Sequence, residues 1–314
     1  MAIFLNILLL LVGFVLLVKG ADFFVDGASG IARLLGIPGF VIGLTVVAMG
    51  TSAPEAAVSI TAGFAGSNEL AISNVIGSNI FNLLVVAGTC AVIKPYKIEN
   101  LLIKRDFPIN IAASILLVVL MLIGRVLGYL NGIVLLAGII AYIAYVVMDA
   151  LKHRETFEEE ETKKLSLPLS LVFIIGGLAA IIFGGNLVVD NATDIAERLG
   201  WSEAFIGLTI VAIGTSLPEL VTSIVAARKG ESGLALGNVI GSNLFNILFI
   251  LGMSSVLCPI SVDTDAIVNT IIMIGVTVAV FIPCFIKKGM GRVVGALSVL
   301  AYVAYTAYLL IFTI

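Results

Sequence analysis

Long apolar runs separated by short polar breaks constrain this sequence more than any other feature. A membrane-spanning helix needs about 20 apolar residues, so 314 residues with a mean hydropathy of +1.19 have room for about ten spans and no sizeable soluble domain. We expect an all-α integral membrane protein of ten transmembrane helices. The expected spans are 2–35, 40–65, 70–93, 103–124, 128–150, 167–199, 203–228, 233–257, 265–286 and 291–313.

Charge is sparse and has no basic cluster. Charged residues are 12% of the chain and the net charge is -3, so we expect no nucleic-acid partner, and no obligatory protein partner is evident. The one strongly charged stretch is LKHRETFEEEETKK at Leu151–Lys164. It predicts a solvated linker at 151–166 between five-helix units at 1–150 and 167–314; a regulatory, ion-binding acidic segment is the alternative.

An internal repeat relates the two units. Residues 20–84 align without gaps onto 184–248 at a constant offset of 164. The main matches are GLTVVAMGTSAPEAAVS (43–59) with GLTIVAIGTSLPELVTS (207–223), and NVIGSNIFN (74–82) with NVIGSNLFN (238–246). Chance similarity between apolar helices would preserve bulk, whereas here Thr, Ser, Pro, Glu and Asn recur in register. The repeat therefore indicates that the chain consists of two homologous halves.

The number of spans sets the orientation of the halves. Five is odd, so the second half is predicted to enter the membrane with the opposite orientation. Positive charges test this, because cytoplasmic loops carry an excess of Lys and Arg. With the N-terminus outside, cytoplasmic loops receive Arg33, Lys94, Lys97, Lys104, Arg105, Lys152, Arg154, Lys163, Lys164, Arg228, Lys229, Lys287, Lys288 and Arg292, and external loops only Arg125 and Arg198. We therefore expect both termini to be extracellular and the linker to be cytoplasmic.

Each half carries Gly-Thr-Ser-x-Pro-Glu near the middle of its second helix, beginning at Gly50 and at Gly214. Proline removes a backbone donor and clashes with the carbonyl four residues earlier. We therefore expect helices 2 and 7 to be broken and to free carbonyls at 47–50 and 211–214. Freed carbonyls at membrane depth are tolerated only where they are buried or line a wet cavity.

The repeated glutamates, Glu55 and Glu219, need a counter-charge. A carboxylate at the bilayer centre costs roughly 2.5–3.5 kcal/mol on insertion scales, and no Lys or Arg lies at similar depth in the same helices. A cation is the natural partner, since carboxylates, hydroxyls and carbonyls are the hard oxygen ligands of Ca²⁺; soft or tetrahedral metals would want Cys or His. A mere proline kink with a helix–helix hydrogen bond would not explain a glutamate in both halves.

The third helix of each half adds a polar face. Its residues, spaced at i, i+4 and i+8, are Asn74, Ser78 and Asn82, then Asn238, Ser242 and Asn246. We expect these faces to meet the Pro-Glu helices at the centre of the protein. Asn and Ser also join membrane helices by hydrogen bonds, which is the structural alternative.

Not every polar residue on or beside these faces is expected to bind the ion. Ligation is favoured over the structural alternative for four residues: Ser78, Ser242, Asn82 and Asn246. It is disfavoured for Asn79 and Asn243. Asp26 and Asp190 also match across the repeat, but near helix ends, where capping or snorkelling is favoured over transport.

At these motifs the sequence resembles the calcium/cation antiporter superfamily, specifically its prokaryotic sodium/calcium exchanger branch. The likeness spans essentially the whole chain. It implies ten spans in two inverted repeats and alternative Na⁺ and Ca²⁺ sites built from matching positions. Those positions are the carbonyl of Ala48, Thr51, Ser52, Glu55, Ser78 and Asn82, then the carbonyl of Ala212, Thr215, Ser216, Glu219, Ser242 and Asn246. Many relatives carry aspartate at one of the two positions that are Asn82 and Asn246 here, so this site offers two carboxylates.

The expected activity is secondary active antiport in a cell membrane, with Ca²⁺ exchanged for Na⁺ as transported substrates and no cofactor. By resemblance, helices 1 and 6 would move against a core of helices 2, 3, 7 and 8. An H⁺/Ca²⁺ exchanger using the same glutamates and a passive cation channel remain alternatives. An intramembrane hydrolase is disfavoured, because the sequence has no catalytic aspartate pair, Ser/His arrangement or HExxH.

Overall fold

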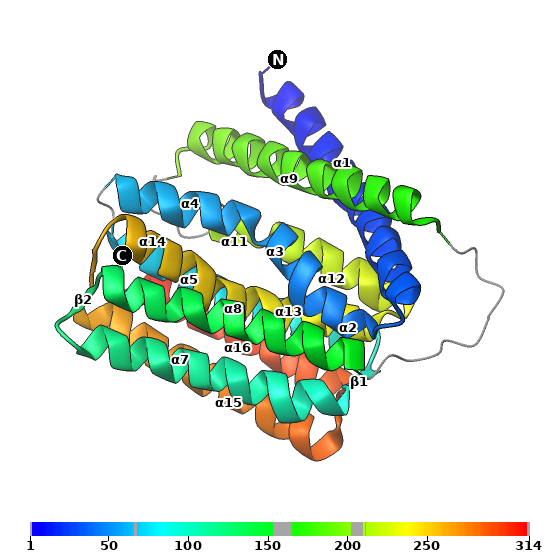
Figure 1. Ribbon diagram of the computed structural model, residues 1–314. Helices are drawn as coiled ribbons and strands as arrows, with labels where there is room; N and C mark the ends of the chain where they lie inside the picture. The colour runs from blue at the N-terminus through cyan, green and yellow to red at the C-terminus, as the bar shows by residue number, and fades with distance from the viewer. Residues whose placement is uncertain (1, 66–67, 153–164, 202–209, 211, 313–314) are drawn as a thin grey trace.

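The computed structural model describes residues 2–65, 68–152, 165–201, 210 and 212–312, and they are almost wholly helical (Figure 1). The α-helices are α1 (Ala2–Leu35), α2 (Gly39–Ile42), α3 (Ala48–Thr51), α4 (Ala53–Phe64), α5 (Asn68–Phe81), α6 (Ala87–Ile93), α7 (Phe107–Leu122), α8 (Tyr129–Lys152), α9 (Leu167–Arg198), α11 (Ala212–Thr215), α12 (Leu217–Lys229), α13 (Ser232–Leu244), α14 (Leu251–Leu257), α15 (Thr264–Lys287) and α16 (Arg292–Phe312). Among the described residues, π-helical turns continue them at η1 (Gly43–Val47), η2 (Asn82–Val86), η3 (Leu102–Asp106) and η5 (Phe245–Ile250).

The described helices fit the expected spans closely. Seven are long and apolar enough to cross a membrane, and an eighth span results if the bent pair Gly39–Thr51 and Ala53–Phe64 is counted as one. Where both ends of an expected span are described, the boundaries agree within two residues. The all-α membrane architecture is confirmed. Part of the span at 203–228 and residues 153–164 of the charged linker lie outside the described residues.

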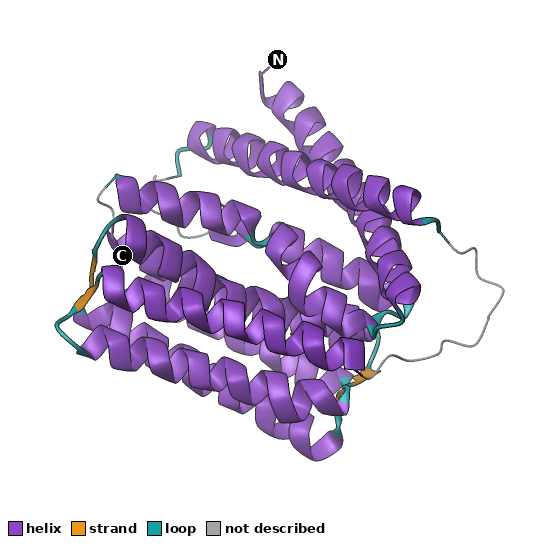
Figure 2. Cartoon of the chain, in the orientation of Figure 1, coloured by secondary structure: helices purple, strands orange, loops and turns teal. Residues whose placement is uncertain are grey.

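Short strands of two residues join the halves in the described part of the chain, and the sequence did not predict them. β1 (Tyr96–Lys97) pairs antiparallel with β4 (Gly289–Met290), and β2 (Val126–Leu127) with β3 (Ile260–Ser261). The two ribbons lie at opposite ends of the bundle (Figures 1 and 2). The offset of 164 carries Tyr96 onto Ile260 and Val126 onto Met290. Exchanging the halves therefore carries each ribbon onto the other, with the register shifted by one residue.

The first helices of the two halves, α1 and α9, pack along one another across one side of the molecule (Figure 1). A Cβ added at Gly13 would lie 2.8 Å from the oxygen of Gly184, and one at Gly20 would lie 2.8 Å from the oxygen of Gly177. Residue numbers rise along α1 as they fall along α9, so the two helices are antiparallel. Glycine at these crossings lets the backbones touch, as small residues do between membrane helices.

A second close contact places α2 and η1 against α13. Gly237 and Gly241 lie one turn apart on α13, and a Cβ at either would come within 2.5 Å of a backbone oxygen of Phe40 or Leu44. The segment Ser232–Leu257 is almost entirely buried inside the protein. The first half of the broken second helix is thus held directly on the third helix of the other half.

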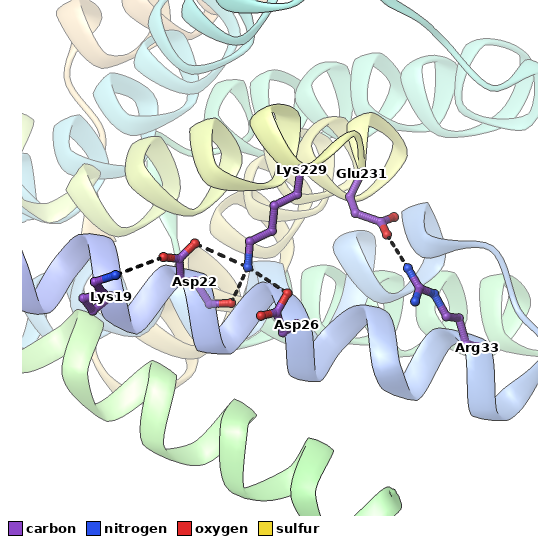
Figure 3. A network of polar contacts seen from close by, with 6 residues as sticks. All are labelled: Lys19, Asp22, Asp26, Arg33, Lys229 and Glu231. Atoms are coloured by element: carbon purple, nitrogen blue, oxygen red, sulfur yellow. Dashed lines mark hydrogen bonds and ion pairs between the residues drawn. The ribbon is translucent and has the colours of Figure 1, made fainter. Parts of the chain in front are cut away.

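Charged side chains tie α1 to the end of α12 (Figure 3). The Nζ of Lys229 donates to Asp26 Oδ1 at 2.7 Å and to the backbone oxygen of Asp22 at 2.8 Å. Arg33 Nη2 donates to Glu231 Oε1 at 3.1 Å. Asp26 therefore has an ion-pair partner on another helix, which the expectation of a cap or a snorkelling group did not include.

Arg105 corrects one expectation. It was counted among the cytoplasmic loop charges, but its side chain is only 8% exposed and lies within η3. Its Nε donates to Asp106 Oδ1 at 2.9 Å and its Nη1 to Asp149 Oδ2 at 2.7 Å. A guanidinium can be buried here because two carboxylates compensate its charge. The excess of positive charge in the predicted cytoplasmic loops therefore has to come from the other Lys and Arg residues.

Candidate ion-binding site

The second helix of the first half is interrupted at its Thr-Ser-x-Pro-Glu segment. Helix α3 ends at Thr51, α4 begins at Ala53, and the two parts are bent by 48°. Pro54 occupies the first turn of α4, where a missing N–H costs little. The second half repeats this: α11 ends at Thr215, α12 begins at Leu217 and Pro218 lies in its first turn.

The break does not free every carbonyl that we expected. The oxygen of Ala48 accepts the N–H of Ser52 at 3.0 Å, and the oxygen of Val47 accepts the hydroxyl of Thr51 at 3.1 Å. The chain turns within one residue, so i→i+4 bonding survives up to the break. The oxygen of Ala48 also lies 3.4 Å from the hydroxyl of Thr51, so both of its lone pairs have a donor nearby. Ala212 begins α11, and only its backbone is described.

The two glutamates are each hydrogen-bonded by the other half. Ser52 Oγ donates to Glu219 Oε1 at 2.8 Å, and Ser216 Oγ donates to Glu55 Oε1 at 3.0 Å. Both carboxylates have 0% exposure and interact electrostatically with each other. The offset of 164 carries 52 onto 216 and 55 onto 219, so the two bonds are equivalent under the repeat.

Further hydroxyls surround the carboxylates. Ser78 Oγ lies 3.1 Å from Ser216 Oγ, and Ser242 Oγ lies 3.5 Å from Glu219 Oε1. Thr51 is fully buried at the end of α3, and Thr215 is 8% exposed at the equivalent end of α11. The polar faces of the third helices do meet the broken helices, as the repeat predicted.

Asn74 and Asn238 occupy the outer part of these faces. Each donates its amide to a serine on the neighbouring broken helix: Asn74 to Ser59 Oγ and Asn238 to Ser223 Oγ, both at 2.9 Å. Asn238 Oδ1 also lies 3.1 Å from Thr51 Oγ1. These two asparagines thus join the second and third helices.

Asn82 and Asn246 lie where α-helix gives way to π-helix, in η2 and η5. Such π-turns are frequent at functional sites because they redirect side chains. Both residues are fully buried, and each uses its amide nitrogen in a hydrogen bond to the other half. Their side-chain oxygens accept no hydrogen bond.

Four buried oxygens on the described glutamates and asparagines of this region therefore have no hydrogen-bond partner. They are Oε2 of Glu55, Oε2 of Glu219, Oδ1 of Asn82 and Oδ1 of Asn246. Among the described residues, neither carboxylate has a basic side chain within ion-pairing distance. Leaving buried acceptors unsatisfied is costly, and a cation is one partner that carboxylate and amide oxygens can share. The described residues hold no cluster of three or more His, Cys, Asp and Glu, and the unpaired atoms here are oxygens, which are hard donors.

Known proteins resemble this chain over nearly its whole length. The profile of the sodium/calcium exchanger protein family matches residues 5–148 and 169–311, which takes in both halves. The chain belongs to the sodium/calcium exchanger family. It is accordingly a multi-pass membrane transporter and not an enzyme.

Two relatives and one solved structure illustrate the membership. The sodium/calcium exchanger MaX1 of Methanosarcina acetivorans is 36% identical, with 97% of this chain and 98% of MaX1 covered. The inner membrane protein YrbG of Escherichia coli is 35% identical, with coverage of 96% and 95%. The solved sodium-calcium exchanger NCX_Mj superposes with a TM-score of 0.86 at 33% identity, over 97% of this chain and 99% of that one.

The structure also brings into this region two residues for which ligation is disfavoured by the sequence. Asn79 and Asn243 are buried beside Asn246 and Asn82 and hydrogen-bond to them. The signal was present, since both asparagines recur in the repeated GSN segments, but a helical-face argument considers one stripe and passes over the adjacent residue.

Proposed function

We propose that this chain exchanges Ca²⁺ for Na⁺ across the cell membrane, expelling cytoplasmic Ca²⁺ as Na⁺ enters down its gradient. The observation that carries the proposal is the set of four partnerless buried oxygens on Glu55, Glu219, Asn82 and Asn246. Two carboxylates neutralise one Ca²⁺ or two Na⁺, so the two kinds of ion would compete for one centre. The names of the relatives MaX1 and NCX_Mj support this choice of ions.

The proposed ligands comprise the repeat glutamates with hydroxyl, carbonyl and amide oxygens from both halves. They are Ala48, Thr51, Ser52, Glu55, Ser78 and Asn82 with Ala212, Thr215, Ser216, Glu219, Ser242 and Asn246. The crossed bonds from Ser52 and Ser216 support the assignment, because each glutamate is oriented by a proposed ligand of the opposite half.

The proposed topology has ten spans in two inverted five-helix repeats, with both termini extracellular and the 151–166 linker cytoplasmic. The antiparallel packing of α1 on α9 supports inversion, since these are equivalent first helices. The exchanged strand pairs at opposite ends of the bundle support it too. Alternating access would move the α1–α9 pair against the core that holds the glutamates.

The test is ⁴⁵Ca²⁺ uptake into proteoliposomes under an outward Na⁺ gradient, an outward H⁺ gradient or no counter-ion gradient. We expect uptake under the Na⁺ gradient only, and its loss in Glu55→Gln and in Glu219→Gln. Uptake driven by H⁺ would replace the proposal with H⁺/Ca²⁺ exchange at the same glutamates. Uptake with no counter-ion gradient would indicate a passive cation channel.

A further inference from the structure

Four asparagines meet where the third helices of the two halves cross: Asn79, Asn82, Asn243 and Asn246. We propose that Asn79 and Asn243 are positioning residues, which turn the amide oxygens of the other two toward the bound cation. This inference rests on the proposed function for the identity of the ion. It concerns residues that would not touch the ion themselves.

The backbone fixes the orientation of the two positioning residues. Asn79 Nδ2 donates to the backbone oxygen of Asn243 at 3.2 Å, and Asn243 Nδ2 donates to the backbone oxygen of Asn79 at 3.2 Å. A backbone carbonyl only accepts hydrogen bonds. The nitrogen end of each carboxamide must therefore face the opposite helix, and its oxygen end must point the other way.

Those oxygen ends determine what the next asparagine can present. Asn79 Oδ1 accepts Asn246 Nδ2 at 3.0 Å, and Asn243 Oδ1 accepts Asn82 Nδ2 at 3.2 Å. Since an amide oxygen can only accept, the partner amide must turn its nitrogen toward it. The oxygens of Asn82 and Asn246 are then the atoms left over, and they are the ones without a hydrogen-bond partner.

The orientation matters because the two ends of an amide act oppositely on a cation. A carboxamide rotated by half a turn would present N–H groups to the ion and withdraw an oxygen ligand. All four side chains are at most 1% exposed, so bulk water cannot replace a lost partner. In a site with aspartate in place of Asn82 or Asn246, both terminal atoms are oxygens and no such selection is needed.

The experiment measures ⁴⁵Ca²⁺ binding to the purified full-length protein in detergent. Asn79→Ala and Asn243→Ala should each raise the Kd for Ca²⁺ about tenfold, the lower end of what losing a residue that orients a metal ligand costs. Asn110→Ala is the matched control: Asn110 is 1% exposed on α7 and its Nδ2 has no hydrogen-bond partner, so it orients no ligand and its loss should leave the Kd unchanged. An unchanged Kd in both quartet variants would overturn the inference.

Double variants distinguish a role of Asn79 and Asn243 in orienting an amide from a role in packing alone. In Asn246→Asp, Asn79→Ala should have less than about a twofold effect on Kd, because no amide remains for Asn79 to orient, whereas Asn243→Ala should keep its tenfold effect through Asn82. In the Asn82→Asp protein, Asn243→Ala should have the small effect on Kd and Asn79→Ala the tenfold effect. A tenfold loss from Asn79→Ala in both backgrounds would show a packing role and refute orientation.

The same proteins distinguish this inference from the proposed function. Tight ⁴⁵Ca²⁺ binding that follows the expected pattern, without gradient-driven uptake, would refute exchange and leave orientation standing. Na⁺-driven uptake by the wild type together with unchanged Ca²⁺ binding in Asn79→Ala and Asn243→Ala would refute orientation alone.

Discussion

The centre of the molecule and the end where α1 meets α12 relate the two halves in different ways. At the centre the crossed bonds occur twice: Ser52 with Glu219 and Ser216 with Glu55 are equivalent under the 164-residue offset. At the α1 end, Lys229 and Glu231 pair with side chains of α1 (Figure 3), but their counterparts in the first half are Ala65 and Ser67. Those ion pairs therefore cannot recur with the halves exchanged.

The repeated contacts belong to the ion-binding site, whereas the contacts that occur once lie at one end of the molecule. A site that opens to either side in turn has to present the same ligands to both, and an inverted repeat with crossed contacts does so. An ion pair confined to one end can favour one arrangement of α1 over another without altering the site. We therefore expect equivalent substitutions in the two halves at the centre to change Ca²⁺ binding equally. A substitution at the α1 end has no equivalent position in the other half.

The largest effect is expected at the glutamates. Glu55→Gln and Glu219→Gln should each weaken Ca²⁺ binding by on the order of a hundredfold or more, since each removes half of the site's negative charge. Symmetry sharpens this prediction: the two Kd values from ⁴⁵Ca²⁺ binding should agree within about a factor of three. A variant that binds Ca²⁺ like the wild type while the other does not would break the equivalence of the halves.

The crossed serines should give the next largest effect. Ser52→Ala and Ser216→Ala each remove a hydroxyl that orients a carboxylate of the opposite half, and hydrogen bonds to charged groups contribute about 1.5–3 kcal/mol, or roughly tenfold and above in Kd. Both variants should weaken Ca²⁺ binding to the same extent. Ser298→Ala is the control, because its hydroxyl bonds only within α16, to the oxygen of Val294. Unequal losses from the two crossed serines would contradict the paired contact.

The sequence predicted the parts of this architecture that depend on repetition and hydropathy. Span boundaries followed from apolar length, and Glu55 and Glu219 stood out because an intramembrane carboxylate needs a partner. Pattern alone could not reveal the π-turns at Asn82 and Phe245, since the same residues fit an uninterrupted α-helix. Nor could it reveal that Arg105 is buried, because its partner Asp149 lies on another helix.

The role of Asn79 and Asn243 shows most clearly where sequence reasoning ends. Their repetition was visible, but a helical stripe ranks residues by the direction they face and not by what a second helix offers them. Only the crossing of α5 and α13 places each amide against the backbone of the other. The positioning role proposed for them rests on these tertiary contacts, whereas local spacing addressed only whether they bind the ion.

A smaller effect is expected where α1 crosses α9. A Cβ at Gly177 would lie 2.6 Å from the backbone nitrogen of Phe24 and 2.7 Å from the oxygen of Gly20. Gly177→Ala should therefore lower the free energy of unfolding by about 1–3 kcal/mol, as overpacking does. Gly176→Ala is the matched control, since nothing lies within 4 Å of its added Cβ. There alanine should stabilise the helix by about 0.5–1 kcal/mol, so thermal unfolding midpoints of the two variants should move in opposite directions.

The smallest effect is expected from Lys229→Gln, which removes the ion pairs with Asp22 and Asp26. The Lys229 side chain is 28% exposed, and pairs of this kind contribute about 1 kcal/mol or less. Lys19→Gln is the control, because Lys19 is 70% exposed and lies 3.9 Å from Asp22. The loss in thermal stability should shrink at 1 M salt, where the Debye length is about 3 Å. A loss that persists at high salt would show that Lys229 holds α1 through packing of its aliphatic stem. The α1 end would then differ from the centre in how its side chains pack and not in its ion pairs.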